Sequence, residues 1–217
     1  MHPVVSLFFD NADDAQASAM AAYMKNKFMF LGVAAPLRRE LQRPWLVREA
    51  LPPIAELNAV VEYLWDAEPR EAQYFAMELV EKYIKQFRRE DLALLEFMAA
   101  NKQWWDSIDL VASKLMGEYF KRFPEEREAA VYRWLAGGDF WLQRCGILFQ
   151  LRYKKQTDTH LLTEAILPVA QSSEFFLQKA IGWALREYRK TNPTWVDDFV
   201  AAHPLKPLSR REAWKHR

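Results

Sequence analysis

Two charged residues stand inside stretches that are otherwise apolar and aromatic. Asp109 lies in WWDSIDLVASKL, and Arg144 lies in DFWLQRCGILFQL. Charged side chains in such surroundings are usually paired or functional. An arginine close to a carboxylate keeps it ionised, and an ionised carboxylate can stabilise developing positive charge and guide a water molecule. Asp109 and Arg144 are therefore the first candidates for chemistry.

An internal repeat links these two positions. The segment FWLQR at 140–144 matches FFLQK at 175–179, an offset of about 35 residues. Two steps of the same length back from Gln143 lead to Gln73. A period of this length is typical of two-helix repeats that stack into a solenoid. The repeat therefore predicts stacked helical hairpins.

Equivalent positions of successive repeats lie side by side in such a fold. Asp109, Arg144 and Lys179 are equivalent, so we expect them on one surface. The aromatic residues that share it by the same step are Trp105, Phe140 and Phe175. For the two phenylalanines, packing within the repeat core is the favoured interpretation.

Helix signals recur along the chain, and no segment alternates long enough to predict a strand. Asp91, Asp139, Asp158 and Ser209 each precede an amphipathic run and are predicted N-caps, with Glu212 completing a capping box after Ser209. The fold class predicted from these patterns is all-α.

Composition narrows the classes of protein and site. The chain has 217 residues, 51% of them hydrophobic, and no Gly/Ser linker divides it, so we expect a single domain over 1–217. The single cysteine, Cys145, excludes an internal disulfide and a zinc site of paired cysteines. The four histidines lack metal-ligand spacing. With neither a leader nor a membrane span in the pattern, we expect a soluble, cytoplasmic protein.

The charge is nearly balanced overall but uneven along the chain. The formal net charge is +1, so a DNA-binding surface would have to be a local patch. Residues 175–217 contain nine basic and four acidic side chains. Charge alone supports a nucleic-acid patch and an ordinary solvated surface equally.

Five segments resemble the AlkD-like family of bacterial DNA alkylation-repair glycosylases, and together they span essentially the whole chain. WWDSID and QKAIGWALREY are the most specific of these motifs. The segments are YMKNKFMFLGV (Tyr23–Val33), WWDSID (Trp104–Asp109), FWLQRCGILFQLRYK (Phe140–Lys154), FFLQKAIGWALREYRKTNP (Phe175–Pro193) and PLSRREAWKH (Pro207–His216).

The resemblance implies HEAT-like helical repeats that form a curved α-solenoid around duplex DNA. It implies hydrolysis of the N-glycosidic bond of N3- or N7-alkylated purines, a step of base excision repair. The family's catalytic aspartate corresponds to Asp109 and its active-site tryptophans to Trp105 and Trp183. Its DNA-contacting residues correspond to Arg144 and Tyr23. Repeat equivalence with Arg144 makes Lys179 a further candidate phosphate contact.

An alkylated purine is cationic and leaves without being protonated, so the expected chemistry needs neither a metal nor an organic cofactor. Asp109 would stabilise the oxocarbenium-like sugar and guide water. Trp105 and Trp183 would attract the developing positive charge. Arg144 would bind a phosphate of the lesion strand or keep Asp109 ionised. The family is thought to act without flipping the base, which predicts that bulky N7 adducts are tolerated.

Two hypotheses from other functional classes stay open. A helical-repeat scaffold could bind a protein partner in its concave face. A non-catalytic protein could bind damaged DNA through a basic surface without depending on Asp109. We expect a monomer on duplex DNA, with binding that weakens steeply as salt rises, whereas a flat salt dependence favours the scaffold.

Overall fold

The computed structural model describes residues 2–215 as helices joined by short loops. Over these residues it contains no strand, and the one isolated β-bridge joins Met29 to Pro69. The predicted all-α class is therefore confirmed. His216, at the end of the last segment that carries the resemblance, lies outside the described residues, as do Met1 and Arg217.

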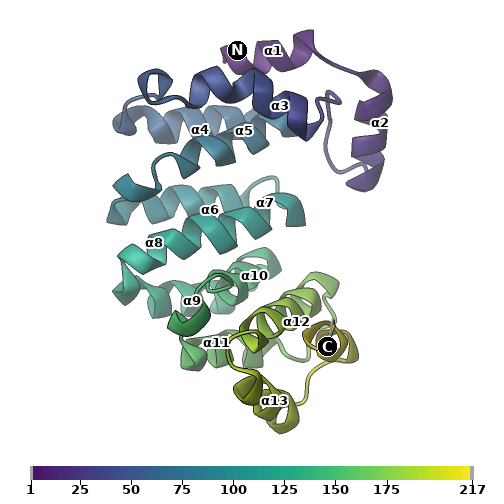
Figure 1. The fold of residues 1–217 in the computed structure, drawn as a ribbon, viewed down its shortest axis with the longest axis vertical. Coiled ribbons are helices and arrows are strands. Elements are labelled where there is room, and N and C mark those ends of the chain that lie inside the picture. Colours follow the sequence, from purple (N-terminus) through teal and green to yellow (C-terminus); the bar gives the residue numbers. More distant parts are fainter. Residues whose placement is uncertain (1, 216–217) are drawn as a thin grey trace. The chain divides into compact units, whose positions relative to one another are not determined.

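The contacts divide the chain into two compact units, Met1–Phe87 and Arg88–Arg217. Figure 1 colours both along the sequence. A single domain over 1–217 stays a prediction.

The first unit packs its helices around an apolar core that includes Phe8, Trp65 and Phe75. Figure 1 shows α4 and α5 lying along each other in this unit. Its α-helices are α1 (Pro3–Asp10), α2 (Asp14–Tyr23), α3 (Ala35–Gln42), α4 (Leu57–Asp66) and α5 (Arg70–Glu81). The unit also contains short 3₁₀ turns, three between α3 and α4 and one after α5, at Arg43–Leu46, Arg48–Ala50, Ile54–Glu56 and Ile84–Gln86.

The second unit stacks consecutive helices, as expected for a helical repeat (Figure 1). Its α-helices are α6 (Leu92–Ala100), α7 (Trp105–Leu110), α8 (Gly117–Arg122), α9 (Arg127–Ala136), α10 (Phe140–Leu148), α11 (Thr159–Ile166), α12 (Phe175–Arg189), α13 (Pro193–Ala202) and α14 (Pro207–Ala213). A π-helical segment, Val111–Met116, joins α7 to α8. The 3₁₀ turns are Arg89–Asp91, Pro124–Glu126, Lys154–Gln156 and Leu167–Val169.

The glutamine that recurs in the repeat has a similar structural task in each copy. Gln73, Gln143 and Gln178 each donate a side-chain N–H to backbone carbonyls near the end of the preceding helical segment. The acceptors are Leu64, Trp65 and Ala67 for the first, Leu135 for the second and Ser172 for the third. Because the last carbonyls of a helix lack partners within it, Gln73 and Gln143 satisfy groups at the ends of α4 and α9, whereas Gln178 bonds the loop before α12.

Of the four predicted side-chain caps, two are confirmed and two are wrong. The carboxylates of Asp139 and Asp158 accept backbone N–H groups at the starts of α10 and α11. The proposed box of Ser209 with Glu212 does not form, because α14 already begins at Pro207, which fits the first turn of a helix. Asp91 directly precedes α6, but its side chain does not cap that helix; it accepts instead from the backbone N–H of Arg88, at the start of the 3₁₀ turn before α6.

Within residues 2–215, no helix is long and apolar enough to cross a membrane. The same residues contain no group of three or more His, Cys, Asp or Glu side chains placed to hold a metal ion.

Candidate functional site

Asp109 and Arg144 form a tight ion pair between α7 and α10. The Nε and Nη2 atoms of Arg144 both lie 2.8 Å from Oδ1 of Asp109. The remaining nitrogen, Nη1, donates to the backbone carbonyl of Phe176 at the start of α12. The guanidinium therefore joins α7, α10 and α12 of the second unit, and its contact with Asp109 is the one that the repeat predicted.

The two partners differ in their access to solvent. The Arg144 side chain is only 4% exposed, whereas the Asp109 side chain is 21% exposed. Burial raises the pKa of the Asp109 carboxyl above its usual range, while the charge and hydrogen bonds of Arg144 lower it and the nearby charge of Asp106 raises it. Asp109 is thus the more accessible member of the pair, with Arg144 stabilising its ionised form.

The helix that carries Asp109 changes its hydrogen-bonding pattern directly after it. Asp109 lies in the last turn of α7, and the π-helical segment begins at Val111. The hydroxyl of Ser113 donates to the Asp109 carbonyl at 2.6 Å. Such π segments are rare and frequently occur at functional sites. Nothing in the residue pattern predicted this one.

Aromatic residues are close in sequence to both members of the ion pair. Trp105 is half-buried and precedes Asp109 by one helical turn, so both residues share one face of α7. The neighbouring Trp104 packs against Trp141 and Phe176, with ring centroids 5.8 and 5.1 Å away. Trp104 directly precedes α7, Trp141 lies on α10 with Arg144, and Phe176, whose carbonyl Arg144 contacts, lies on α12.

Two further aromatic residues, Phe175 and Phe140, differ in their exposure to solvent. Phe175 is 52% exposed, and the Lys179 ammonium lies 5.7 Å from the centre of its ring. The expectation that Phe175 packs in the core is therefore wrong, because the first turn of α12 presents it to solvent. Phe140 is half-buried, and its ring lies 4.7 Å from that of Trp141.

Lys179 and Trp183 lie one turn apart on α12, and both are half-buried. Lys179 donates to Oε1 of Glu212 on α14 at 2.9 Å. Arg186, two turns after Lys179, contacts the other oxygen of the same carboxylate at 3.1 Å. The candidate phosphate contact is therefore ion-paired within the protein, a partnership that the repeat could not predict.

Tyr23 belongs to the first unit, where it ends α2 and is 68% exposed. None of the residues of α2 is buried. At its start, Gly32 packs so closely on the backbone of Asp13 that an added Cβ would lie 2.1 Å from the Asp13 oxygen. The buried Glu71 carboxylate fixes this loop by accepting the N–H groups of residues 31, 32 and 33.

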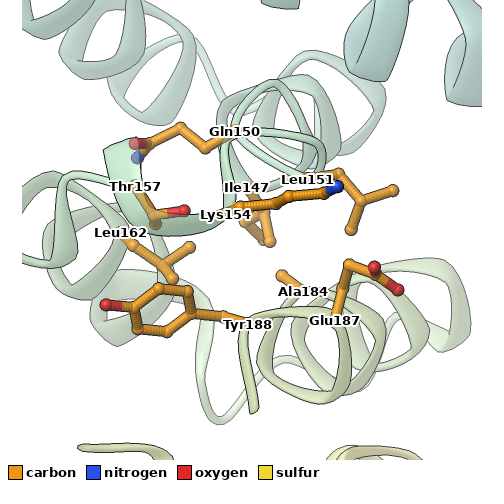
Figure 2. A pocket seen from close by; sticks show the side chains of 9 residues that line it. All are labelled: Ile147, Gln150, Leu151, Lys154, Thr157, Leu162, Ala184, Glu187 and Tyr188. Atoms are coloured by element: carbon orange, nitrogen blue, oxygen red, sulfur yellow. The ribbon is translucent and has the colours of Figure 1, made fainter. Parts of the chain in front are cut away.

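A small cavity lies between α10, α11, α12 and the turn after α10. Figure 2 shows Ile147 and Lys154 facing Ala184 and Tyr188 across it. Its volume is about 10 Å³, enough for a single water molecule but far too small for a purine. Asp109 is not among the residues that line it.

Cys145 is buried, and burial raises the pKa of its thiol. Because a thiol must ionise to act as a nucleophile, this residue is suited to packing and not to catalysis.

Two comparisons identify relatives of this chain. The family model described as DNA alkylation repair enzyme matches residues 5–216. A solved structure described as a predicted DNA alkylation repair enzyme from Enterococcus faecalis is similar to it, with 34% sequence identity and a TM-score of 0.88. That match covers 94% of this chain and 96% of the other. A search of curated proteins found no match.

Proposed function

The chain belongs to the DNA alkylation repair enzyme family, and we propose that it is a DNA glycosylase that hydrolyses the N-glycosidic bond of N3- or N7-alkylated purines in duplex DNA. The observation that carries this proposal is the Asp109–Arg144 pair, which places a largely buried but still accessible carboxylate against a buried guanidinium. A scaffold for protein partners has no need of such a pair. Family membership directs the chemistry toward alkylated DNA.

The proposed reaction uses the positive charge of the substrate. Alkylation at N3 or N7 makes the purine cationic, so the base departs without a proton from the enzyme. Asp109 stabilises the oxocarbenium-like deoxyribose and guides the attacking water. Trp105, one turn before Asp109 on the same helix, and Trp183 each contribute about 0.5–2 kcal/mol by offering a ring face to this charge.

The positively charged residues have different tasks in this proposal. Arg144 keeps Asp109 ionised, since two of its nitrogens already contact that carboxylate. A phosphate contact by Arg144 stays a prediction, and the 4% exposure of its side chain favours the first role. Lys179 and the exposed Tyr23 contact the DNA backbone, which fixes the position of the protein on the duplex. No step in this scheme uses a metal or an organic cofactor.

The deciding experiment measures base release from duplex DNA that carries N7-methylguanine. We expect the wild type to free the base and Asp109→Asn to retain DNA binding but to lose about 100-fold or more in rate, because charge stabilisation in the transition state is lost. Asp106→Asn removes a carboxylate from the same helix and serves as the matched control; it should retain most of the activity.

The alternative outcomes separate the competing functions. If neither the wild type nor the control frees N7-methylguanine or N3-methyladenine, the protein is not a glycosylase for these lesions. Tight, salt-dependent DNA binding without base release would then indicate a non-catalytic damage binder. Absence of DNA binding would indicate a scaffold for a protein partner.

A further inference from the structure

Glu212 holds two cations of α12 with one carboxylate. Its Oε1 accepts from Lys179 at 2.9 Å and its Oε2 from Arg186 at 3.1 Å. Arg186 also donates to the Glu212 backbone carbonyl at 2.9 Å. The Glu212 side chain is buried, and the pair of cations lowers the pKa of its carboxyl, so it is ionised at neutral pH.

A glycine brings this carboxylate to its place. Lys179, Gly182 and Arg186 recur at helical spacing, so they lie along one face of α12. A Cβ at Gly182 would lie 2.4 Å from the Glu212 Cβ and 2.7 Å from the Ser209 oxygen. Only glycine lets α14 approach this closely, and the approach places Glu212 where it contacts both Lys179 and Arg186.

The two cations are held unequally. Arg186 makes two hydrogen bonds to Glu212, one of them to the backbone, and its side chain is 24% exposed. Lys179 makes one hydrogen bond to it, and its side chain is 35% exposed. Lysine is a compact charge on a flexible stem, so Lys179 is the partner that can leave. Arg186 would then still compensate the buried carboxylate, which avoids the large cost of an unpaired buried charge.

We propose that Glu212 competes with DNA for Lys179, so that the lysine ammonium moves from the Glu212 carboxylate to a phosphate when the protein binds a duplex. This proposal rests on the proposed function, in which Lys179 contacts the backbone. Glu212 thereby lowers the affinity for every duplex, damaged or not. A weaker hold on undamaged DNA shortens each non-productive encounter, and a weaker hold on product speeds its release.

The test is the dissociation constant for an undamaged duplex, measured by fluorescence anisotropy over a range of salt concentrations. Glu212→Gln keeps the size of the side chain and its hydrogen-bond acceptor for Arg186 but releases Lys179 from the ion pair. We expect it to tighten binding about three- to five-fold, the range of a partly exposed ion pair. Glu187→Gln is the control. It removes an acid of α12, the helix that carries Lys179, but this acid pairs with Lys190, so the substitution should change binding much less.

A double variant isolates the lysine. Lys179→Gln should weaken binding and reduce the slope of log K against log salt by about 0.9, the effect of one lost phosphate contact. In that background, Glu212→Gln should no longer tighten binding. An equal gain from Glu212→Gln and Glu187→Gln would overturn the proposal, as would a gain that persists without Lys179. An unchanged salt slope for Lys179→Gln would overturn it even if Glu212→Gln failed to fold.

Base release by the wild type, measured on the same preparation, separates this proposal from the proposed function. Base release together with unchanged DNA binding by Glu212→Gln overturns only the competitor role. The absence of base release together with Lys179-dependent tightening overturns only the glycosylase activity.

Discussion

Arg144 directs two nitrogens at a single oxygen of Asp109, and its third nitrogen donates to the backbone carbonyl of Phe176 at the start of α12. The guanidinium that binds the Asp109 carboxylate is therefore itself held in place by a second contact, to the backbone. A guanidinium held in this way can orient and ionise Asp109 without moving when substrate arrives. We therefore expect substitution of Arg144 to lower both the stability of the fold and the activity.

Arg144→Gln should destabilise the fold by about 3 kcal/mol, because it leaves a largely buried carboxylate without its cation. Arg133→Gln is the matched control, since Arg133 also pairs with an acid, Glu96, but its side chain is 55% exposed. The control should cost less than about 1 kcal/mol. Urea unfolding of the two variants measures the difference. Equal losses in the free energy of unfolding would show that the Asp109–Arg144 pair contributes no more than an exposed ion pair.

The pH dependence of base release should report the environment of Asp109. Burial raises the pKa of this carboxyl, so it stays protonated to a higher pH than an exposed aspartate, whose pKa is about 3.9. Since the proposed reaction needs the ionised form, kcat/KM should fall as pH decreases, with an acidic limb above that value. Arg144 lowers the pKa of Asp109, so Arg144→Gln should move the limb further upward. A limb that stays in place in this variant would contradict the assignment of Asp109.

The sequence was most informative where neighbours follow from the repeat. The offset that links FWLQR to FFLQK placed Asp109 beside Arg144, and the 2.8 Å contacts confirm it. The same offset found the recurring glutamines whose side chains bond backbone carbonyls that precede their own helices. Repeats make such predictions possible because equivalent positions contact each other wherever the copies stack.

Contacts outside the repeat step could not be predicted in this way. Glu212 matched a capping box with Ser209, yet its partners Lys179 and Arg186 lie on another helix. The signal that could have corrected this was Pro207, which marks an earlier start of α14. The sequence after Asp109 does not distinguish a π-helical segment from an ordinary α-helix. Tertiary packing can override local helix preferences, so such a segment cannot be predicted from local sequence.

Bulky N7 adducts should be released at rates within about ten-fold of N7-methylguanine. In the proposed mechanism Asp109 acts on the sugar, so no pocket has to enclose the base, and a base pocket is what limits lesion size in enzymes that flip. The rates can be compared on one duplex sequence that carries either the methyl lesion or an adduct several atoms larger. Release of the methyl lesion alone would indicate an enclosing pocket and argue for base flipping.

Gly182→Ala should disturb the contact between α12 and α14, whereas Gly146→Ala should be tolerated. A Cβ at Gly182 would lie 2.4 Å from the Glu212 Cβ and 2.7 Å from a backbone oxygen, so we expect a loss of about 2 kcal/mol as α14 is displaced. At Gly146, in α10, the nearest atom would lie 3.6 Å away, an ordinary contact. There alanine should stabilise the helix by up to about 1 kcal/mol.

Chemical denaturation of both glycine variants, together with base release, tests this prediction. Because Trp183 follows Gly182 directly and Glu212 contacts Lys179, displacement of α14 should also lower activity under conditions where the variant is still folded. Gly146→Ala should keep full activity, although Gly146 lies only two residues from Arg144. If both variants are equally stable and active, the close approach at Gly182 does not position this part of the site.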